Sequence, residues 1–278
     1  GLAGDTLVIS APAHCHRPQA LEAGGKVWGP AVQLYALRSS RNWGIGDFSD
    51  LAQLTEQVAQ QGAGIIGLNP LHALFVHNPA HTSPYSPSSR LQLNVLYIDV
   101  EAVDGFYQCE TARQRVQSPE FQLRLVALRE SPLVDHVGVA GLKFEVLELL
   151  YADFQARHLS NGVPGSTDAA ATSDPRACDA LGQSFLDFIA ERGDALHRHA
   201  LFEALQASFH AADTSVWGWP VWPEAYQDLT GPDVARFAHE NATRVRFHQY
   251  LQWQAARQLA RVSDRCEALG LAVGLYLD

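Results

Sequence analysis

The chain has 278 residues, 47% of them hydrophobic, and a formal net charge of -10. This length and apolar content can build one large domain or two small ones. The acidic balance, with no basic run, argues against nucleic-acid and anionic-membrane partners, and no apolar stretch reaches the roughly 18 to 20 residues of a membrane span.

The N-terminal segment, residues 1–25, is interpreted as the last strand of a β domain followed by a linker, and residues 26–278 as the main domain. Cys15 lies between His14 and His16 in this segment. Neighbouring residues of an extended segment point to opposite faces, so these three side chains do not share one metal ion, and we expect no metal site. The four cysteines are far apart and form no CxxC pair, which favours reduced thiols in a cytoplasmic protein.

The first strand-and-helix unit begins with the strand-like segment 28–37 and continues through "RSSRNWGIGDF". Asp47 can cap the first amides of a helix, and Asp50 supplies the second acid of a capping box. Apolar residues then recur at helical spacing, and Gly62 is expected to end the helix. They are Phe48, Leu51, Leu54 and Val58.

Two further aliphatic runs predict strands, "AGIIGLNPLHALF" and the final "LAVGLYLD". The first is nearly continuous, which is typical of a strand buried on both faces. A strand, a helix and a second strand in this order predict parallel pairing with a right-handed crossover. We therefore expect an α/β fold, a (β/α)8 TIM barrel truncated after its third strand.

Residues 76–268 separate the second and third strands and are expected to form mainly an inserted, mostly helical subdomain. "NVLYIDVEAV", residues 94–103, is predicted to be a further short strand. Residues 160–175, "SNGVPGSTDAAATSDP", are predicted to be a flexible loop. The helical segments are predicted at 119–130, 142–159, 178–209 and 233–269.

Polar residues at strand ends are the candidates for a site, because chemistry in such barrels gathers at the carboxyl ends of the strands. Tyr85 stands between Pro84 and Pro87, and these restrict the shape of its loop. A phenol ring on a rigid loop can stack on a sugar, or it can pack under its neighbours. Asp278 ends the third predicted strand. It is either a substrate-binding carboxylate or a cap for the next loop.

Asn69 and His72 follow the second predicted strand in "LNPLH", and they are compatible with a site without defining one. The aromatic segment "VWGWPVWPEAY" contains Trp217, Trp219 and Trp222. It is either an exposed sugar or partner platform or a buried cluster, and we favour burial because large aromatic residues dominate cores. No Ser-His-Asp set, phosphate-binding loop or dinucleotide motif occurs, and we expect no cofactor.

Several of these stretches together resemble the 4-alpha-glucanotransferases, also called amylomaltases or disproportionating enzymes. The resemblance extends from about Thr6 to Asp278. It is carried by "VQLYALRS", "NWGIGDF", "IGLNPLHALF", "SPYSPSSR", "YIDV", "WGWPVWPEAYQ" and "GLYLD".

The resemblance implies a retaining transferase of the alpha-amylase clan that moves α-1,4-glucan segments between maltooligosaccharides, with glucose also an acceptor. A nucleophilic Asp and an acid/base Glu would flank the cleaved bond. Tyr85 matches the tyrosine that stacks near the sugar next to that bond, and Asp278 matches an acid near the same sugar. Ser83, Asn69 and His72 lie in matching motifs and are carried over as site-shaping residues.

The resemblance also implies that the nucleophile, the acid/base and a stabilising Asp lie beyond residue 278, so that no catalytic residue is assigned in this chain. We therefore expect a fragment that is inactive and unstable alone. Two alternatives stay open. One is a clan-related α-glucan hydrolase. The other is a non-catalytic carbohydrate-binding protein, if the gene ends at Asp278.

Overall fold

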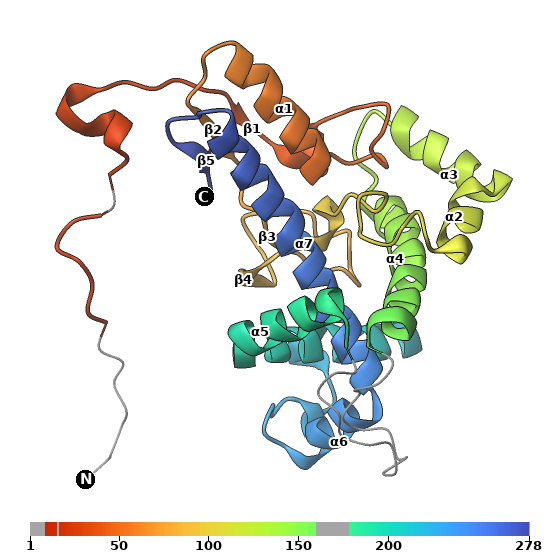
Figure 1. Ribbon diagram of the computed structural model, residues 1–278. Helices are drawn as coiled ribbons and strands as arrows, with labels where there is room; N and C mark the ends of the chain where they lie inside the picture. Colours follow the sequence, from red (N-terminus) through yellow and green to blue (C-terminus); the bar gives the residue numbers. More distant parts are fainter. Residues whose placement is uncertain (1–8, 16, 160–177, 278) are drawn as a thin grey trace, which may run out of the picture.

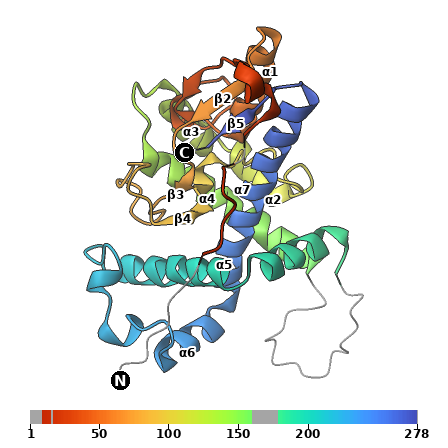
Figure 2. The ribbon, with the colours of Figure 1, turned by 90° about the vertical axis from the view of Figure 1, so that its left-hand side faces the viewer.

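The computed structural model describes residues 9–15, 17–159 and 178–277 (Figure 1). A small parallel sheet lies at one end, α7 runs from beside it toward the other end, and α5 lies across the molecule and crosses α7 (Figure 2). The chain is a mixed α/β structure. Within the described residues the parallel sheet is open and has three strands, and no closed barrel forms. The expected (β/α)8 barrel stays a prediction.

The parallel sheet has the strand order β1-β2-β5, with β1 at Ala31–Val32, β2 at Ile65–Leu68 and β5 at Gly274–Tyr276. Both pairings are parallel, as the strand-helix-strand order predicts. Gly29 permits the close approach of the chain before β1 to β2, because a Cβ atom there would lie 1.6 Å from the Ile65 carbonyl oxygen. Along β2, buried and half-buried residues alternate, so the prediction of burial on both faces was wrong.

The helix α1 (Phe48–Gln60) follows the sequence prediction closely. The Asp47 carboxylate accepts hydrogen bonds from the amides of Ser49 and Asp50, and the Asp50 carboxylate accepts one from the Asp47 amide. These contacts complete the capping box. Gly62 has a φ of 81°, in the left-handed region that lets glycine end a helix.

A two-stranded antiparallel ribbon follows the sheet, formed by β3 (His72–Ala73) and β4 (Ser89–Leu93). The prediction of a strand at 94–103 was wrong. Asn94 instead caps the 3-10 helix η3 (Val95–Tyr97) by accepting a hydrogen bond from the Leu96 amide, and turns continue from there. The strand β4 ends before this segment, at Leu93. Three consecutive residues of η3 are buried, whereas a strand would point them alternately to opposite faces.

The helices between β4 and β5 confirm the predicted helical character of this part of the chain. Helix α5 contains a kink at Gly193, where φ is 52°. The α-helices are α2 (Glu110–Gln117), α3 (Pro119–Glu130), α4 (His136–His158), α5 (Ala180–Ala212), α6 (Pro232–Glu240) and α7 (Ala242–Ala268). The remaining 3-10 helices are η1 (Gln19–Gly24), η2 (Leu34–Ala36), η4 (Trp219–Val221) and η5 (Glu224–Tyr226).

Two hydrophobic cores hold the structure. The larger joins the parallel sheet, α1, η3 and the helices α2–α4 and α7, and the smaller lies between the second half of α5, Trp222 and α6. The predicted burial of the tryptophan segment is confirmed for Trp222 and wrong for Trp217 and Trp219, which are about half exposed. The buried Trp222 indole packs in the smaller core, and its N–H donates a hydrogen bond to Gln206 Oε1.

Several predictions fall on residues that the structure does not describe. The whole of the expected flexible loop 160–175 lies outside the described residues, as do residues 1–8 of the N-terminal segment, His16 of the His-Cys-His stretch and Asp278. Among the helices of the described part, none combines the length and apolar character needed to cross a membrane.

Candidate functional site

Asn69 lies at the carboxyl end of β2, where a site was predicted, and its side chain is buried in contacts with the protein itself. Its Oδ1 accepts a hydrogen bond from the Leu34 amide at 2.7 Å, and its Nδ2 donates to the Pro70 carbonyl and the Tyr97 hydroxyl. Burial raises the pKa of Tyr97 to about 12, while the hydrogen bond with Asn69 opposes the shift. Asn69 thus fixes the ends of β1 and β2 relative to each other.

His72 begins β3 and pairs with Leu93 of β4. Its side chain is half-buried, and none of the described residues makes a hydrogen bond to the imidazole. The ring therefore has two nitrogens available at the surface between the sheet and the ribbon, a position from which it can contact a ligand.

Residues 74–88 connect β3 to β4 and are called the Tyr85 loop below. Pro84 and Tyr85 occupy the two central positions of a turn that the Ser86 amide closes by donating to the Ser83 carbonyl at 3.1 Å. Proline favours the first central position of such a turn, because its φ is already correct. Tyr85 is 67% exposed, so its ring is not packed under its neighbours, which was one of the two alternatives from the sequence.

Ser83 is exposed beside Tyr85, whereas Asn69 follows β2 directly and His72 begins β3. Asp278 lies outside the described residues. Within the described part, no hydrogen bond joins any two of Asn69, His72, Ser83 and Tyr85, and their roles in binding a sugar stay predictions.

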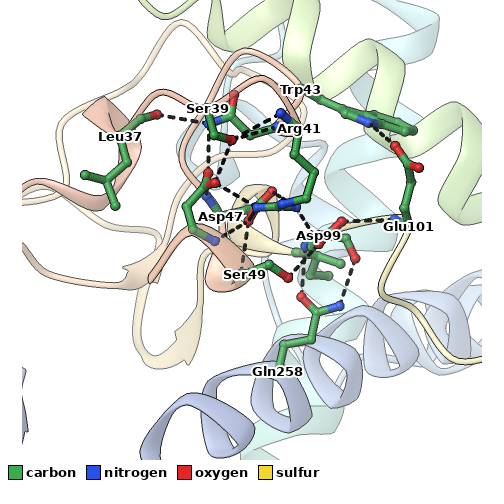
Figure 3. A network of polar contacts seen from close by, with 12 residues as sticks. Leu37, Ser39, Arg41, Trp43, Asp47, Ser49, Asp99, Glu101 and Gln258 are labelled. Atoms are coloured by element: carbon green, nitrogen blue, oxygen red, sulfur yellow. Dashed lines mark hydrogen bonds and ion pairs between the residues drawn. The ribbon is translucent and has the colours of Figure 1, made fainter. Parts of the chain in front are cut away.

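A charged network that the sequence did not predict lies in the loop between β1 and α1 (Figure 3). Arg41 binds Asp47 and Asp50 at 2.7 Å and Asp99 at 2.6 Å, and the three carboxylates are almost completely buried. Burial alone would lower the pKa of Arg41, but hydrogen bonding to Asp47 and the three negative charges raise it above its ordinary value. One cation thus neutralises part of the charge of three acids.

Two residues from distant helices complete this network. Lys143 on α4 is fully buried and donates hydrogen bonds to the Leu96 and Ile98 carbonyls, and burial lowers its pKa. Gln258 on α7 makes paired hydrogen bonds with the main chain of Asp99. The capping box was the one feature of the sequence that pointed to this network, because both of its acids, Asp47 and Asp50, also bind Arg41.

The network holds the segment 39–50 rigidly at the carboxyl side of β1, and its acids are used by protein groups. In the part of the chain that the structure describes, no group of three or more His, Cys, Asp or Glu side chains has an arrangement that could hold a metal ion. We therefore assign the Arg41 network a structural role and assign the exposed Tyr85 loop as the candidate ligand-binding element.

Comparisons with known proteins identify the family of this chain. The family profile of the 4-alpha-glucanotransferases, glycoside hydrolase family 77, matches residues 32–278. The 4-alpha-glucanotransferase of Haemophilus influenzae is 36% identical over 275 residues, which are 98% of this chain and 37% of that protein. The 4-alpha-glucanotransferase of Mycobacterium bovis is 32% identical over 92% of this chain and 32% of its own length.

Solved structures show the same fold. The amylomaltase of Corynebacterium glutamicum aligns with a TM-score of 0.62 and 26% identity, over 90% of this chain and 29% of that one. The amylomaltase of Streptococcus agalactiae, solved in complex with acarbose, aligns with a TM-score of 0.62 and 15% identity, over 88% of this chain and 41% of that one.

The parallel strands with polar loops after them, interrupted by a helical insertion, define part of an α/β protein of the amylomaltase fold. The chain belongs to glycoside hydrolase family 77, the 4-alpha-glucanotransferases. It spans about a third of the length of the curated relatives cited above.

Proposed function

We propose that the protein carrying this chain is a 4-alpha-glucanotransferase, which transfers α-1,4-glucan segments between maltooligosaccharides and uses glucose as a further acceptor. The observation that carries the proposal is the match of the family profile to nearly the whole chain. The proposed architecture is a (β/α)8 barrel to which β1, β2 and β5 contribute the first three strands. Their parallel pairing and the insertion between β2 and β5 support it.

The proposed reaction is a retaining double displacement. An Asp attacks the anomeric carbon and forms a glycosyl-enzyme, while a Glu donates a proton to the departing glucan oxygen. The same Glu then removes a proton from the 4-hydroxyl of the acceptor, which attacks the anomeric carbon and releases the Asp. We expect both acids, and a stabilising Asp, in sequence that follows residue 278. Asp278 itself is proposed to contact the same sugar.

The proposed contribution of this chain is binding rather than bond cleavage. Tyr85 would stack on the sugar next to the cleaved bond, because its ring is exposed on a loop whose turn is fixed by Pro84. Asn69 would shape the site indirectly, through its bonds to Leu34 and Tyr97. His72 and Ser83 would contribute polar atoms at the edge of the site.

Product analysis of the whole protein tests this function. With maltotriose as the only substrate, a transferase releases glucose and forms longer maltooligosaccharides while the number of reducing ends stays constant. A clan-related hydrolase would instead increase the number of reducing ends steadily. A carbohydrate-binding protein without catalysis would leave maltotriose unchanged, and either of these results would overturn the proposal.

A further inference from the structure

The Tyr85 loop makes few polar contacts with the helices that surround it. Its hydrogen bonds are local turns and bonds at its base, where the Ser88 amide donates to the Ala73 carbonyl. Among the described residues, no hydrogen bond joins segment 75–87 to a helix. One close polar contact is present. His77 Nε2 lies 3.8 Å from Glu203 Oε2, a carboxylate oxygen on α5.

His77 lies where three helices meet. Its ring packs edge-on against Phe144 of α4, with centroids 6.2 Å apart, and against His248 of α7 at 5.7 Å. Glu203 of α5 approaches the same ring. His77 therefore brings a polar atom of the loop to the helical insertion.

Glu203 is an unusual residue to find at this position, because its side chain is almost completely buried and no cation neutralises it. Within the described residues, Glu203 Oε1, His77 Nε2 and His248 Nε2 are all buried without a hydrogen-bond partner. Buried polar atoms are costly unless they are paired. One oxygen of the Glu203 carboxyl group and two nearby imidazole nitrogens thus all lack partners, which suggests that they share one hydrogen-bond network.

A small cavity adjoins Glu203 and His248 and is also lined by His199 and Gln252. The space open to the centre of a water molecule is about 10 Å³, close to the smallest volume that holds one buried water. A water here can donate one hydrogen to Glu203 Oε1 and the other to His248 Nε2. Glu203 Oε2 then remains for His77.

We propose that Glu203 is a positioning residue for the Tyr85 loop: its carboxyl group, with one water in the adjoining cavity, holds His77 and thereby fixes the loop on α5 and α7. In this arrangement the Glu203 O–H donates to His77 Nε2. The separation of 3.8 Å is longer than a hydrogen bond, so the proposed bond requires the carboxyl group to rotate toward His77. The consequence for catalysis rests on the proposed role of Tyr85.

The contact is a bond between neutral groups rather than an ion pair. Burial raises the pKa of Glu203 to about 8, and burial lowers the pKa of His77 to about 4, helped by the charges of Arg244 and His210. Two further histidines face the pair. Burial lowers the pKa of His248 on α7, and it lowers the pKa of His199 on α5 to about 4. The residue of α4 that contacts His77 is Phe144, which has no titratable group. At pH 7 the acid is therefore protonated and the imidazoles are neutral.

The test measures amide hydrogen exchange by mass spectrometry in the whole protein that carries this chain. Glu203→Leu should speed exchange in residues 75–87 by about tenfold, the effect of losing one buried hydrogen bond. Glu203→Gln should restore protection to within about threefold, since its amide can donate to His77. His77→Phe keeps the ring packing but loses the nitrogen, and it should loosen the loop as Glu203→Leu does.

Gln206→Leu is the matched control. Gln206 lies one turn along α5, is equally buried, and bonds Trp222 and the Val216 carbonyl instead of the loop. It should leave exchange in 75–87 unchanged. Protection of α1 shows that each variant is folded. His77→Phe keeps the ring packing against Phe144 and His248, so it tests the contact even if Glu203→Leu does not fold.

A pH series separates positioning from simple space filling. After correction for the intrinsic exchange rate, the wild-type loop should lose protection between pH 7 and 9 as Glu203 ionises, and Glu203→Gln should not. Unchanged loop exchange in both Glu203→Leu and His77→Phe would overturn the proposal, and so would an equal effect of Gln206→Leu. A loosened loop with unchanged glucan transfer would leave the proposal standing and contradict the role of Tyr85.

Discussion

Gln258 and Asp99 are joined by two hydrogen bonds of 2.8 Å, one from the Asp99 amide to the glutamine Oε1 and one from the glutamine Nε2 to the Asp99 carbonyl. Gln252, further toward the N-terminus of the same helix, pairs with Leu93 in the same manner. Two side chains of α7 thus satisfy main-chain groups as a neighbouring strand would. These four hydrogen bonds hold residues 93–99, the segment from the end of β4 to the Arg41 network, against α7.

Replacing Gln258 by Leu should weaken this segment. The change leaves the Asp99 amide and carbonyl buried without partners, at a cost of about 2 to 4 kcal/mol in local opening free energy. Hydrogen exchange of residues 93–101 in the whole protein measures this cost. Gln249→Leu is the control, because Gln249 is buried on the same helix and its side chain makes no hydrogen bond with the described residues. Equal effects of the two changes would contradict the assignment.

Replacing Arg41 by Met should be among the more destabilising changes in the described part of the chain. It leaves three nearly buried carboxylates without their cation, and we expect a loss of about 3 kcal/mol in the free energy of unfolding. Arg41 is itself one third exposed, which keeps the expectation at the lower end of the range for buried pairs. Urea unfolding of the wild type and the variant measures the difference.

Arg115→Met is the comparison for this change. Arg115 also binds two acids, but Glu120 is exposed to water, and the half-buried Glu145 keeps its ion pair with Arg124. We expect a clearly smaller effect than for Arg41→Met. If the two variants unfold at the same urea concentration, burial of the carboxylates is not what makes Arg41 important.

The cluster around Glu203 predicts how stability depends on pH. Burial raises the pKa of Glu203 from 4.5 to about 8, so the folded state binds an extra proton and stability falls as pH rises through this window. Burial lowers the pKa values of His77 and His199 from 6.5 to about 4, so stability falls as pH decreases from 6.5 toward 4. His248, whose pKa is also lowered by burial, acts in the same direction. In that range the three histidines outweigh the one glutamate. The contribution of the cluster is therefore greatest near pH 6.5.

Urea unfolding between pH 5 and 9 tests this dependence. Between pH 6.5 and 8 the wild type should lose up to about 1.4 kcal/mol per pH unit, the value for one proton. The difference in stability between the wild type and Glu203→Gln isolates this contribution from other titrating groups. A difference that stays constant from pH 6.5 to 8 would show that Glu203 is not held in its protonated form.

The elements that the sequence predicted well are those specified by neighbouring residues. Helix α1 has its cap, its apolar stripe and its terminal glycine within one stretch, and local contacts decide its limits. The parallel strands were recognisable from aliphatic runs. The segment 94–103 has a similar apolar composition, but Asn94 caps a 3-10 turn there, and composition alone does not distinguish the two.

The polar clusters could not be predicted because their members come from distant parts of the chain. Asp99 and Gln258 meet Arg41 only after the insertion has folded back, and the same is true of His77, Glu203 and His248. The predicted burial of the tryptophan segment was partly wrong for a related reason, because burial there depends on contacts with the distant helix α5. Trp222 is buried where Gln206 can accept its N–H, whereas Trp217 and Trp219 lie beyond the small core.

The proposed sugar contact of Tyr85 is tested most directly by the rate of glucan transfer from maltotriose in variants of the whole protein. Tyr85→Ala should lower kcat/KM roughly 2- to 12-fold, the equivalent of 0.5 to 1.5 kcal/mol of lost stacking, and Tyr85→Phe should lower it less because the ring remains. Tyr107→Ala is the control, since Tyr107 is 69% exposed, as Tyr85 is at 67%, and lies in another loop. It should transfer glucan at the wild-type rate. Wild-type transfer by Tyr85→Ala would contradict the assignment of Tyr85 to the sugar-binding site.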